Sequence, residues 1–328
     1  MKKILKYAAY LIAILFIAVA ALLSYVKLAL PKVSEAEDLK IDYTAERIER
    51  GQYLANSVTV CMDCHSTRDW SKFSGPLKDG TMGKGGELFD QKVGLPGVFY
   101  SKNITPEGIS RYTDGELFRV ITTGVTKEGR AMFPLMPYPY YGHMDREDIY
   151  AIIAYVRSLS PIKNEVPESV ADFPMNFIIN TIPKDAELQT KPDTTDMLSY
   201  GGYITNASGC IECHTQINKG QIIPTLAFGG GREFKFPNGN AVWSANISPD
   251  AESGIGKWSQ ETFVQRFKAY ADSSYVVPAI KSEDFNSVMP WMMYRNMKEQ
   301  DLIAIYTYLK SVKPISNTVV KYSTAAKL

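Results

Sequence analysis

The sequence predicts a mainly α-helical protein, in which one membrane-spanning helix is followed by two tandem copies of a small domain. Three observations lead to this fold class. A run of 20 uncharged residues, Tyr7 to Val26, stands near the N-terminus. The pattern C-x-x-C-H occurs twice, and matched residues flank both copies in the same order. At 328 residues, the chain is long enough for about two domains besides the apolar segment.

The apolar run is the first element. As a helix, Tyr7–Val26 is long enough to cross a bilayer core of about 30 Å. Lys2, Lys3 and Lys6 precede it, which places the N-terminus in the cytoplasm by the positive-inside rule. A cleaved signal peptide is the rival interpretation, but its apolar core is usually shorter and ends in a small-residue cleavage site. We expect residues 1–32 to be an uncleaved anchor in a bacterial inner membrane, with the rest of the chain in the periplasm.

The exported part has an ordinary globular composition. Hydrophobic residues make up 45% of the chain and charged residues 22%. Residues 33–328 contain 31 basic and 35 acidic side chains, a net charge of −4. A body so close to neutral gives no support for nucleic-acid binding.

The two pentapeptides, Cys61–His65 and Cys210–His214, carry the chemistry. C-x-x-C-H is the attachment pattern of c-type haem, in which the histidine becomes an axial ligand of the iron. The two copies use all four cysteines and two of the three histidines. A zinc site would need further ligands, with only His143 to spare, and a redox dithiol would be expected in a βαβ pattern. The sequence thus predicts two covalently bound haem c groups, held by Cys61, Cys64, His65, Cys210, Cys213 and His214.

An internal repeat surrounds these motifs. The matched landmarks are Gly51–Tyr53 with Gly201–Tyr203, Gly85-Gly86 with Gly230-Gly231, Asn103-Ile104 with Asn246-Ile247, and Met136-Pro137 with Met289-Pro290. Their offset drifts between 143 and 153 residues, as expected for two homologous domains with small insertions. We place the domains at residues 43–162 and 197–318. The linker, 163–196, is expected to run over the surface, with one short ordered piece around Phe173–Ile182.

Each repeat closes with a predicted helix. Asp148–Tyr155 and Asp301–Tyr308 have apolar residues at helical spacing. Pro161 and Pro314 follow them, as prolines often do beyond the end of a helix.

Each repeat resembles a class I cytochrome c domain, with its G-x-Y helix, C-x-x-C-H, long loop, Met-Pro and closing amphipathic helix. The pair is similar to the cytochrome subunits of membrane-bound alcohol and aldehyde dehydrogenases, from about Glu49 to Pro314. Together with the apolar run, the resemblance predicts an N-terminal transmembrane helix followed by two tandem class I cytochrome c domains. Those subunits usually carry three haems, whereas this chain has two motifs.

The resemblance also implies a methionine sulfur as the second axial ligand. Two methionine pairs keep a constant offset when the closing helices are aligned: Met136 with Met289, and Met144 with Met297. The second pair stands just before a helix start, where a hydrophobic staple is expected. The first pair precedes proline, which fixes the backbone direction. We therefore assign the iron ligands as His65, Met136, His214 and Met289.

Three polar residues remain to be interpreted. His143 has Asn296 as its counterpart, so we interpret it as a surface or capping residue; the alternative is a ligand to the first haem. Asn103 and Asn246 fit the N-x-[ST] glycosylation pattern. We interpret them instead as loop residues packed near a haem edge.

The predicted function is electron transfer without catalysis. Iron with two protein ligands has no open position for a substrate, and methionine ligation raises its reduction potential, which suits transfer towards a terminal oxidase. The expected partners are redox proteins: a dehydrogenase, a quinol-linked complex or an oxidase. The rival is a di-haem cytochrome c peroxidase, in which one haem needs an open position; the matched Met-Pro pairs argue against it. A haem-based sensor lacks a recognisable output domain.

Overall fold

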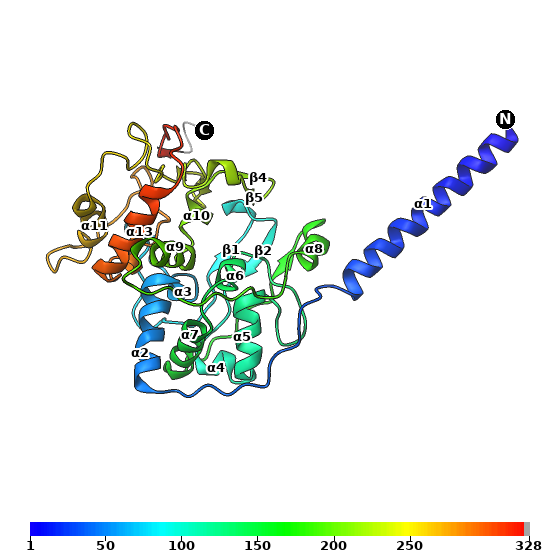
Figure 1. Cartoon of the computed structure of the whole chain (residues 1–328). Helices are drawn as coiled ribbons and strands as arrows, with labels where there is room; N and C mark the ends of the chain where they lie inside the picture. The colour runs from blue at the N-terminus through cyan, green and yellow to red at the C-terminus, as the bar shows by residue number, and fades with distance from the viewer. Residues whose placement is uncertain (325–328) are drawn as a thin grey trace.

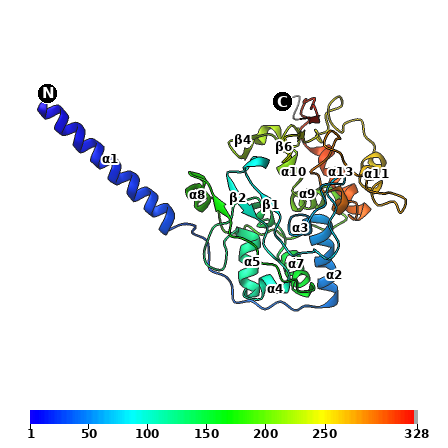
Figure 2. The same ribbon diagram turned by 180° about the vertical axis from the view of Figure 1, so that it is seen from behind.

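The N-terminal helix stands apart from the rest of the molecule. The computed structural model describes residues 1–324. Helix α1 (Lys2–Leu28) projects away from the body, and none of its residues is buried (Figures 1 and 2). Its apolar window has a mean hydropathy of 2.5, so it is long and apolar enough to cross a membrane.

The first repeat forms the lower half of the body in Figure 1 and is mainly helical. Its elements are α2 (Ala45–Tyr53), a π-helical turn (Leu54–Val58), α3 (Cys61–Cys64), β1 (Leu88–Phe89), a 3₁₀ turn (Gln91–Val93), β2 (Gly97–Tyr100), α4 (Pro106–Ile109), α5 (Asp114–Thr123), α6 (Tyr138–Tyr141), α7 (Arg146–Ser158) and β3 (Val170–Ala171). Helix α7 contains the predicted closing helix, and the side chain of Asp145 caps it by accepting from Glu147 N.

The second repeat has the same order of main elements. They are α9 (Met197–Ala207), α10 (Cys210–Cys213), β4 (Ile217–Asn218), β5 (Gln221–Ile222), a 3₁₀ turn (Pro224–Leu226), β6 (Glu233–Lys235), β7 (Ala241–Trp243), α11 (Gln260–Lys268), α12 (Trp291–Tyr294), α13 (Glu299–Ser311) and β8 (Tyr322–Ser323). The pairs α2/α9, α3/α10, α5/α11, α6/α12 and α7/α13 correspond. The mainly helical prediction is confirmed.

A small antiparallel sheet completes each repeat. In the first, β2 pairs with β1 on one side and β3 on the other; in the second, β7 pairs likewise with β6 and β8. The third strand comes each time from the segment after the closing helix. As a result β3 lies inside the predicted linker, and β8 lies beyond the predicted end of the second domain.

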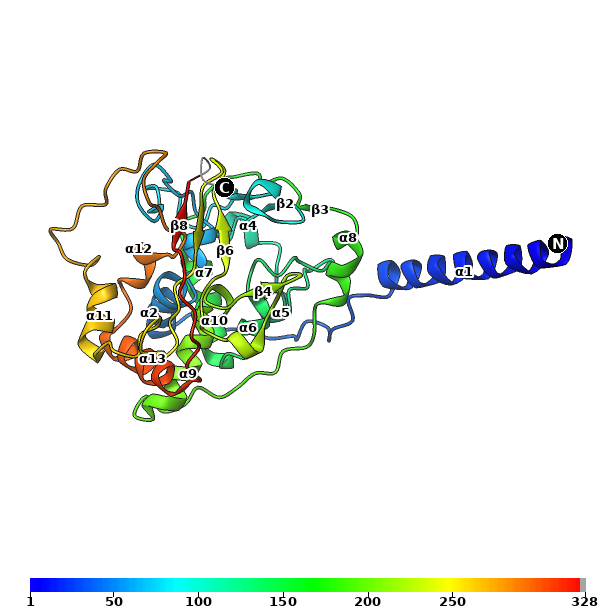
Figure 3. The same cartoon turned by 90° about the horizontal axis from the view of Figure 1, so that it is seen from above.

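The rest of the predicted linker contains the expected ordered piece. Helix α8 (Met175–Ile178) and a 3₁₀ turn (Ile179–Thr181) follow β3. Figure 3 shows α8 as the part of the body nearest to α1, and Lys27 at the end of α1 lies 5.9 Å from the ring centroid of Phe177.

The two repeats share one interior. A single apolar cluster runs through both, with Leu54 and Ile149 from the first and Ile204 and Leu302 from the second, all fully buried. Reciprocal hydrogen bonds cross the boundary. The hydroxyl of Tyr53 donates to Asp301, and its counterpart Tyr203 donates to Asp148 at 2.7 Å. Each repeat thus uses its first long helix to bind the closing helix of the other.

Candidate haem-binding site

Each C-x-x-C-H pattern folds as a single helical turn, α3 or α10. A left-handed residue precedes each turn: Val60 at φ 46° in the first repeat and Gly209 at φ 64° in the second. The backbone N–H of the histidine donates to the carbonyl oxygen of the first cysteine, at 3.0 Å in the first motif and 2.9 Å in the second. Residues three apart lie on one face of a helix, so both cysteines of a motif leave the turn on the same side.

Both motif histidines are held by a backbone carbonyl. Nδ1 of His65 donates to Lys102 O at 2.7 Å, and Nδ1 of His214 donates to Ala245 O at 2.7 Å. A carbonyl oxygen only accepts, so the proton occupies Nδ1 and the lone pair of Nε2 is available to a metal. Burial lowers the pKa of both histidines, which favours the neutral form that metals bind.

The Gly-Gly pairs of the repeat lie directly against these carbonyls. Gly85 has φ +70°, and its N–H donates to His65 O at 2.8 Å. A Cβ there would lie 2.6 Å from Lys102 O, so a side chain cannot be accommodated without moving the histidine's acceptor. Gly230 repeats the arrangement, with its N–H on His214 O at 2.8 Å. The glycines are therefore required for close approach beside the histidine, and no phosphate loop is involved.

Asn103 and Asn246 fix the same acceptor loop from its other side. Nδ2 of Asn103 donates to Ile162 O at 2.7 Å, and Oδ1 accepts from Thr105 N and Oγ1 at 2.9 and 2.7 Å. Asn246 makes the equivalent bonds in the second repeat. Both side chains are buried, which rules them out as accessible glycosylation acceptors. They tie the loop that binds the histidine to the segment after the closing helix.

An acid inside each motif is paired with an arginine. Asp63 accepts from Arg68 at 2.8 Å, and both side chains are nearly buried. Burial raises the pKa of Asp63 to about 6, although Arg68 opposes this shift. Glu212, the equivalent acid, pairs with Arg232 at 2.5 Å. The positive charge comes from a different part of the loop in each repeat, so the sequence repeat gave no sign of this pairing.

The surroundings of the thiols do not favour a redox dithiol. All four cysteines are free. Burial raises the pKa of Cys64 and Cys210 to about 12, whereas a reactive dithiol has a lowered thiol pKa. Within residues 1–324, no group of three or more Cys, His, Asp or Glu side chains is placed to hold a metal ion.

The two Met-Pro pairs form the same tight turn. Tyr138 N donates to Met136 O at 2.7 Å, and Trp291 N donates to Met289 O at 2.8 Å. The prolines between them have φ/ψ of −77°/49° and −78°/61°, close to an inverse γ-turn. Both methionines are half-buried against the apolar cluster.

A buried tyrosine ties each Met-Pro turn to its own C-x-x-C-H motif. The hydroxyl of Tyr141 donates to Thr59 O at 2.9 Å, two residues before Cys61. Tyr294 donates to Ser208 O at 2.6 Å, two residues before Cys210. The structure therefore brings the methionine segment and the haem motif together in both repeats. These tyrosines were missed in the sequence, although they share the 153-residue offset of Met136 and Met289.

The other sequence candidates occupy different surroundings. Met144 and Met297 are fully buried in the core, at 0% and 1% exposure, in agreement with a packing role. His143 is half-buried, and its Nδ1 donates to Glu187 O at 3.2 Å. That bond directs one of its ring nitrogens to the linker, as expected for a residue outside the two motifs.

The donor set fits covalent haem. Each repeat supplies two thiols on one helical turn, a histidine with Nε2 available and a thioether on a turn tied to that motif. Thiolate and imidazole alone would also suit zinc, but a thioether is a soft ligand that hard cations avoid. The same set occurs twice, built from matched elements.

Comparison with known proteins agrees with this donor set. No protein-family model matches the chain. Over 294 residues it is 26% identical to the cytochrome c subunit of the quinone alcohol dehydrogenase of Gluconacetobacter polyoxogenes. The alignment covers 84% of this chain and 58% of that subunit.

The chain is similar to cytochrome c subunits of dehydrogenases. The gluconate 2-dehydrogenase cytochrome c subunit of Pantoea cypripedii is 27% identical over 289 residues, covering 83% of this chain and 61% of the relative. The fructose dehydrogenase cytochrome subunit of Gluconobacter japonicus is 27% identical over 278 residues, covering 81% and 52%. The chain thus spans little more than half the length of these curated relatives. The resemblance to alcohol dehydrogenase cytochrome subunits is confirmed, and it supports covalently bound haem c.

Proposed function

We propose that this chain is a membrane-anchored di-haem cytochrome c that carries electrons. The single observation that supports it best is the repeated pairing of a carbonyl-held histidine with a Met-Pro turn. In both repeats the tyrosine that follows the turn binds the backbone just before the first cysteine. One such unit would suit many metal centres, but two matched units with the haem attachment pattern favour one cofactor bound twice.

The residues have distinct tasks in this proposal. Cys61, Cys64, Cys210 and Cys213 hold two haems covalently, His65 and His214 supply the nitrogen ligands, and Met136 and Met289 supply the sulfur ligands. A haem with both axial positions filled accepts and releases one electron at a time. The carbonyl oxygens of Lys102 and Ala245 fix the two imidazoles, and these histidines would hold the iron in a set orientation. A rigid ligand set lowers the structural rearrangement that each transfer requires.

The location follows from α1. With Lys2, Lys3 and Lys6 on the cytoplasmic side, both repeats lie in the periplasm. Anchoring keeps the protein close to membrane-bound redox partners. Since the similar proteins are named as cytochrome c subunits of dehydrogenases, we propose a dehydrogenase or a quinol-linked complex as the donor and a terminal oxidase as the final acceptor.

The test replaces one methionine at a time. Full-length protein should contain two covalent haems per chain by the pyridine haemochrome assay. Met136→Ala and Met289→Ala should each remove half of the sulfur-to-iron charge-transfer absorbance and create one site that binds cyanide or carbon monoxide. Met132→Ala is the matched control, because Met132 stands in the same loop without a methionine counterpart; it should retain the full absorbance.

The wild-type protein distinguishes the rival function. A carrier with filled axial positions should not turn over hydrogen peroxide. If unaltered protein binds cyanide stoichiometrically and reduces peroxide, one haem has an open position and the di-haem peroxidase assignment replaces the carrier.

A further inference from the structure

A loop of the first repeat reaches into the second. Between His65 and Gly85 the chain has 19 residues, whereas only 15 separate His214 from Gly230. The longer loop contains residues 69–75, which lie against the second repeat. Lys72 forms an isolated antiparallel bridge with Ala279.

Phe73 anchors this loop. Its N–H donates to Pro278 O at 2.9 Å. Its ring stacks on Tyr270 with centroids 6.1 Å apart and lies 6.3 Å from Phe285. A stacked aromatic contact and a backbone bond, both across the boundary, fix the position of the next residue, Ser74.

Ser74 binds the backbone of the Met289 turn. Its Oγ donates to Met289 O at 2.6 Å and accepts from Trp291 N at 3.2 Å. Its N–H donates to Asn286 Oδ1 at 2.9 Å. Ser74 is 1% exposed and has φ +58°, a left-handed conformation that costs energy in a non-glycine residue. A strained, buried serine therefore bridges the two backbone groups on either side of Pro290.

The Met136 turn is held differently. Among the described residues, the hydrogen bonds to Met132 and to the turn itself come from the first repeat: Met132 N donates to Gly124 O at 2.8 Å, and Tyr138 OH donates to Met132 O at 3.3 Å. The second repeat contacts this segment beyond the turn, where Asn206 Nδ2 donates to Tyr140 O at 3.0 Å. Asn286, which receives the Ser74 N–H, corresponds to Phe133. Among the described residues, a side chain of the other repeat thus binds the backbone of the proline turn itself at Met289 and not at Met136.

We propose that Ser74 is a positioning residue for the axial ligand Met289, so that the first repeat completes the second haem site. This proposal rests on the proposed function, because it requires Met289 to bind iron. Without the Ser74 hydroxyl, Met289 O and Trp291 N lose their shared partner, and the turn that presents the sulfur becomes easier to displace. The Met136 ligand should be unaffected.

The experiment measures imidazole binding to the ferric full-length protein in detergent, by absorbance. Ser74→Gly removes the hydroxyl, keeps the N–H and relieves the left-handed backbone, so it should fold. Half-saturation of one of the two haems should require roughly fivefold to tenfold less imidazole than in the wild type, the ratio expected when the turn loses the modest net stabilisation of the Ser74 hydroxyl's hydrogen bonds. The other haem should bind as before. Ser71→Ala, on the same loop with an exposed hydroxyl bonded to Asp69, is the matched control and should change nothing.

A double variant shows whether Ser74 acts through Met289. In a Met289→Ala background the second haem is already open, so adding Ser74→Gly should alter imidazole binding by less than about twofold. A full fivefold effect in that background would overturn the proposal, as would wild-type binding by Ser74→Gly alone. If Met289→Ala itself leaves imidazole binding unchanged, the ligand assignment fails and takes the Ser74 role with it. These outcomes separate failure of the positioning role from failure of the proposed function.

Discussion

At the scale of single residues, the two matched methionine pairs differ in how deeply their side chains are buried. Met136 and Met289 are half-buried on proline turns, while Met144 and Met297 are enclosed by the core. From sequence alone, loss of either core methionine is expected to cost about 1 kcal/mol, as for a local apolar contact. Because both side chains are completely buried, we expect a larger loss of stability.

Met144→Ala should therefore be a stability variant with unchanged spectra. A fully buried methionine replaced by alanine leaves a cavity and typically costs 2–5 kcal/mol. Urea unfolding of the full-length protein should show a lower midpoint, while the sulfur-to-iron absorbance of the folded protein keeps its wild-type intensity. A loss of that absorbance would instead make Met144 an iron ligand and displace Met136 from the assignment.

Helix packing explains the first landmark of each repeat at the scale of elements. A Cβ on Gly51 would lie 1.8 Å from Ala151 O, and one on Gly201 would lie 2.0 Å from Ala304 O. The glycines let α2 cross α7, and α9 cross α13, with backbones in contact. A Cβ on the neighbouring Gly202 would lie 3.2 Å from the ring of Tyr308, a close contact that a small shift of this side chain can relieve.

Gly201→Ala should consequently be far more damaging than Gly202→Ala. The first forces α9 and α13 apart and should lower the free energy of unfolding by about 3 kcal/mol or more, the upper range for overpacking. The second adds a favourable helix residue at a tolerant position and should change stability by less than about 1 kcal/mol. Equal effects of the two substitutions, measured by chemical denaturation, would contradict the close helix crossing.

The features that could be predicted from the sequence are those that occur in both repeats. Motif spacing located α3 and α10, and apolar periodicity located α7 and α13, because both signals are local. Contacts made by backbone atoms do not depend on residue type and cannot be predicted from it. Lys102 and Ala245 bind the histidines through their carbonyl oxygens alone, so their side chains do not identify them as partners. Ser74 was invisible for a different reason. It lies in an insertion present in one repeat, and its partners are more than 200 positions away in the chain.

At the scale of the molecule, the boundary between the repeats has approximate two-fold symmetry, because equivalent residues of the two repeats make equivalent contacts across it. Tyr203 accepts from Asp145 N at 3.1 Å as it donates to Asp148, and Tyr53 accepts from Lys298 N at 3.0 Å as it donates to Asp301. An interface between equivalent surfaces is expected to be reciprocal in this way.

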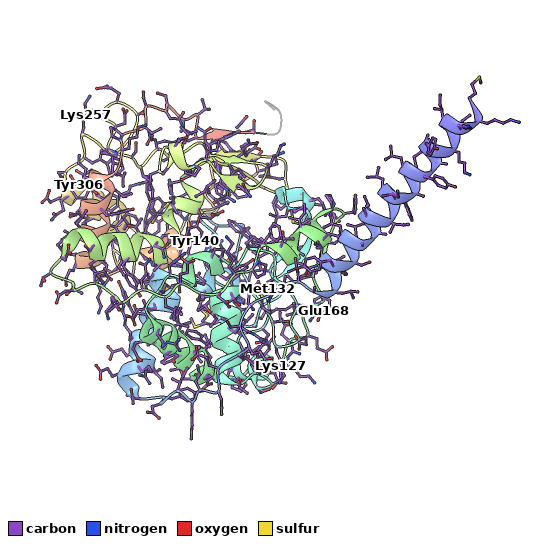
Figure 4. The ribbon with its side chains drawn as sticks, turned by 45° about the vertical axis from the view of Figure 1, so that its right-hand side comes forward. Lys127, Met132, Tyr140, Glu168, Lys257 and Tyr306 are labelled. Carbon is purple, nitrogen blue, oxygen red and sulfur yellow. The ribbon has the colours of Figure 1, made fainter. Side chains whose placement is uncertain are left out.

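One cross-boundary contact has no equivalent of the same type. Tyr140 donates to Glu212 inside the second motif at 2.8 Å, and its label in Figure 4 stands near the centre of the body that α1 projects from. Its counterpart by offset is Met293, which has no hydroxyl. Together with Ser74, this bond means that the first repeat contacts both the C-x-x-C-H motif and the Met289 turn of the second repeat.

The buried tyrosines give the whole molecule a defined response to alkaline pH. Burial, with the nearby Asp148 carboxylate, raises the pKa of Tyr203 well above its usual value. In the unfolded chain this tyrosine loses its proton near pH 10, so above that pH the unfolded state binds fewer protons and stability falls as pH rises. The contribution is fully present below about pH 10 and decreases by up to about 1.4 kcal/mol per pH unit above it.

Tyr203→Phe removes both this titration and the hydrogen bonds to Asp148 and Asp145. At pH 8 the variant should be less stable than the wild type by about 1–3 kcal/mol, because a buried acceptor and a backbone N–H lose a partner, although Arg50 still binds Asp148 at 2.8 Å. Between pH 8 and pH 11 the difference should narrow by about 1.4 kcal/mol, since only the wild type pays for keeping this tyrosine protonated in the folded state. Urea unfolding of both proteins, followed by far-ultraviolet circular dichroism, measures the difference, and pH effects on the haem ligands cancel because both proteins share them.

Tyr53→Phe tests whether the interface is reciprocal. The difference in free energy of unfolding between the wild type and this variant should also decrease between pH 8 and pH 11. For Tyr203→Phe, a stability difference from the wild type that stays constant from pH 8 to pH 11 would show that Tyr203 titrates alike in the folded and unfolded chain. Tyr203 would then not be a buried residue of the boundary.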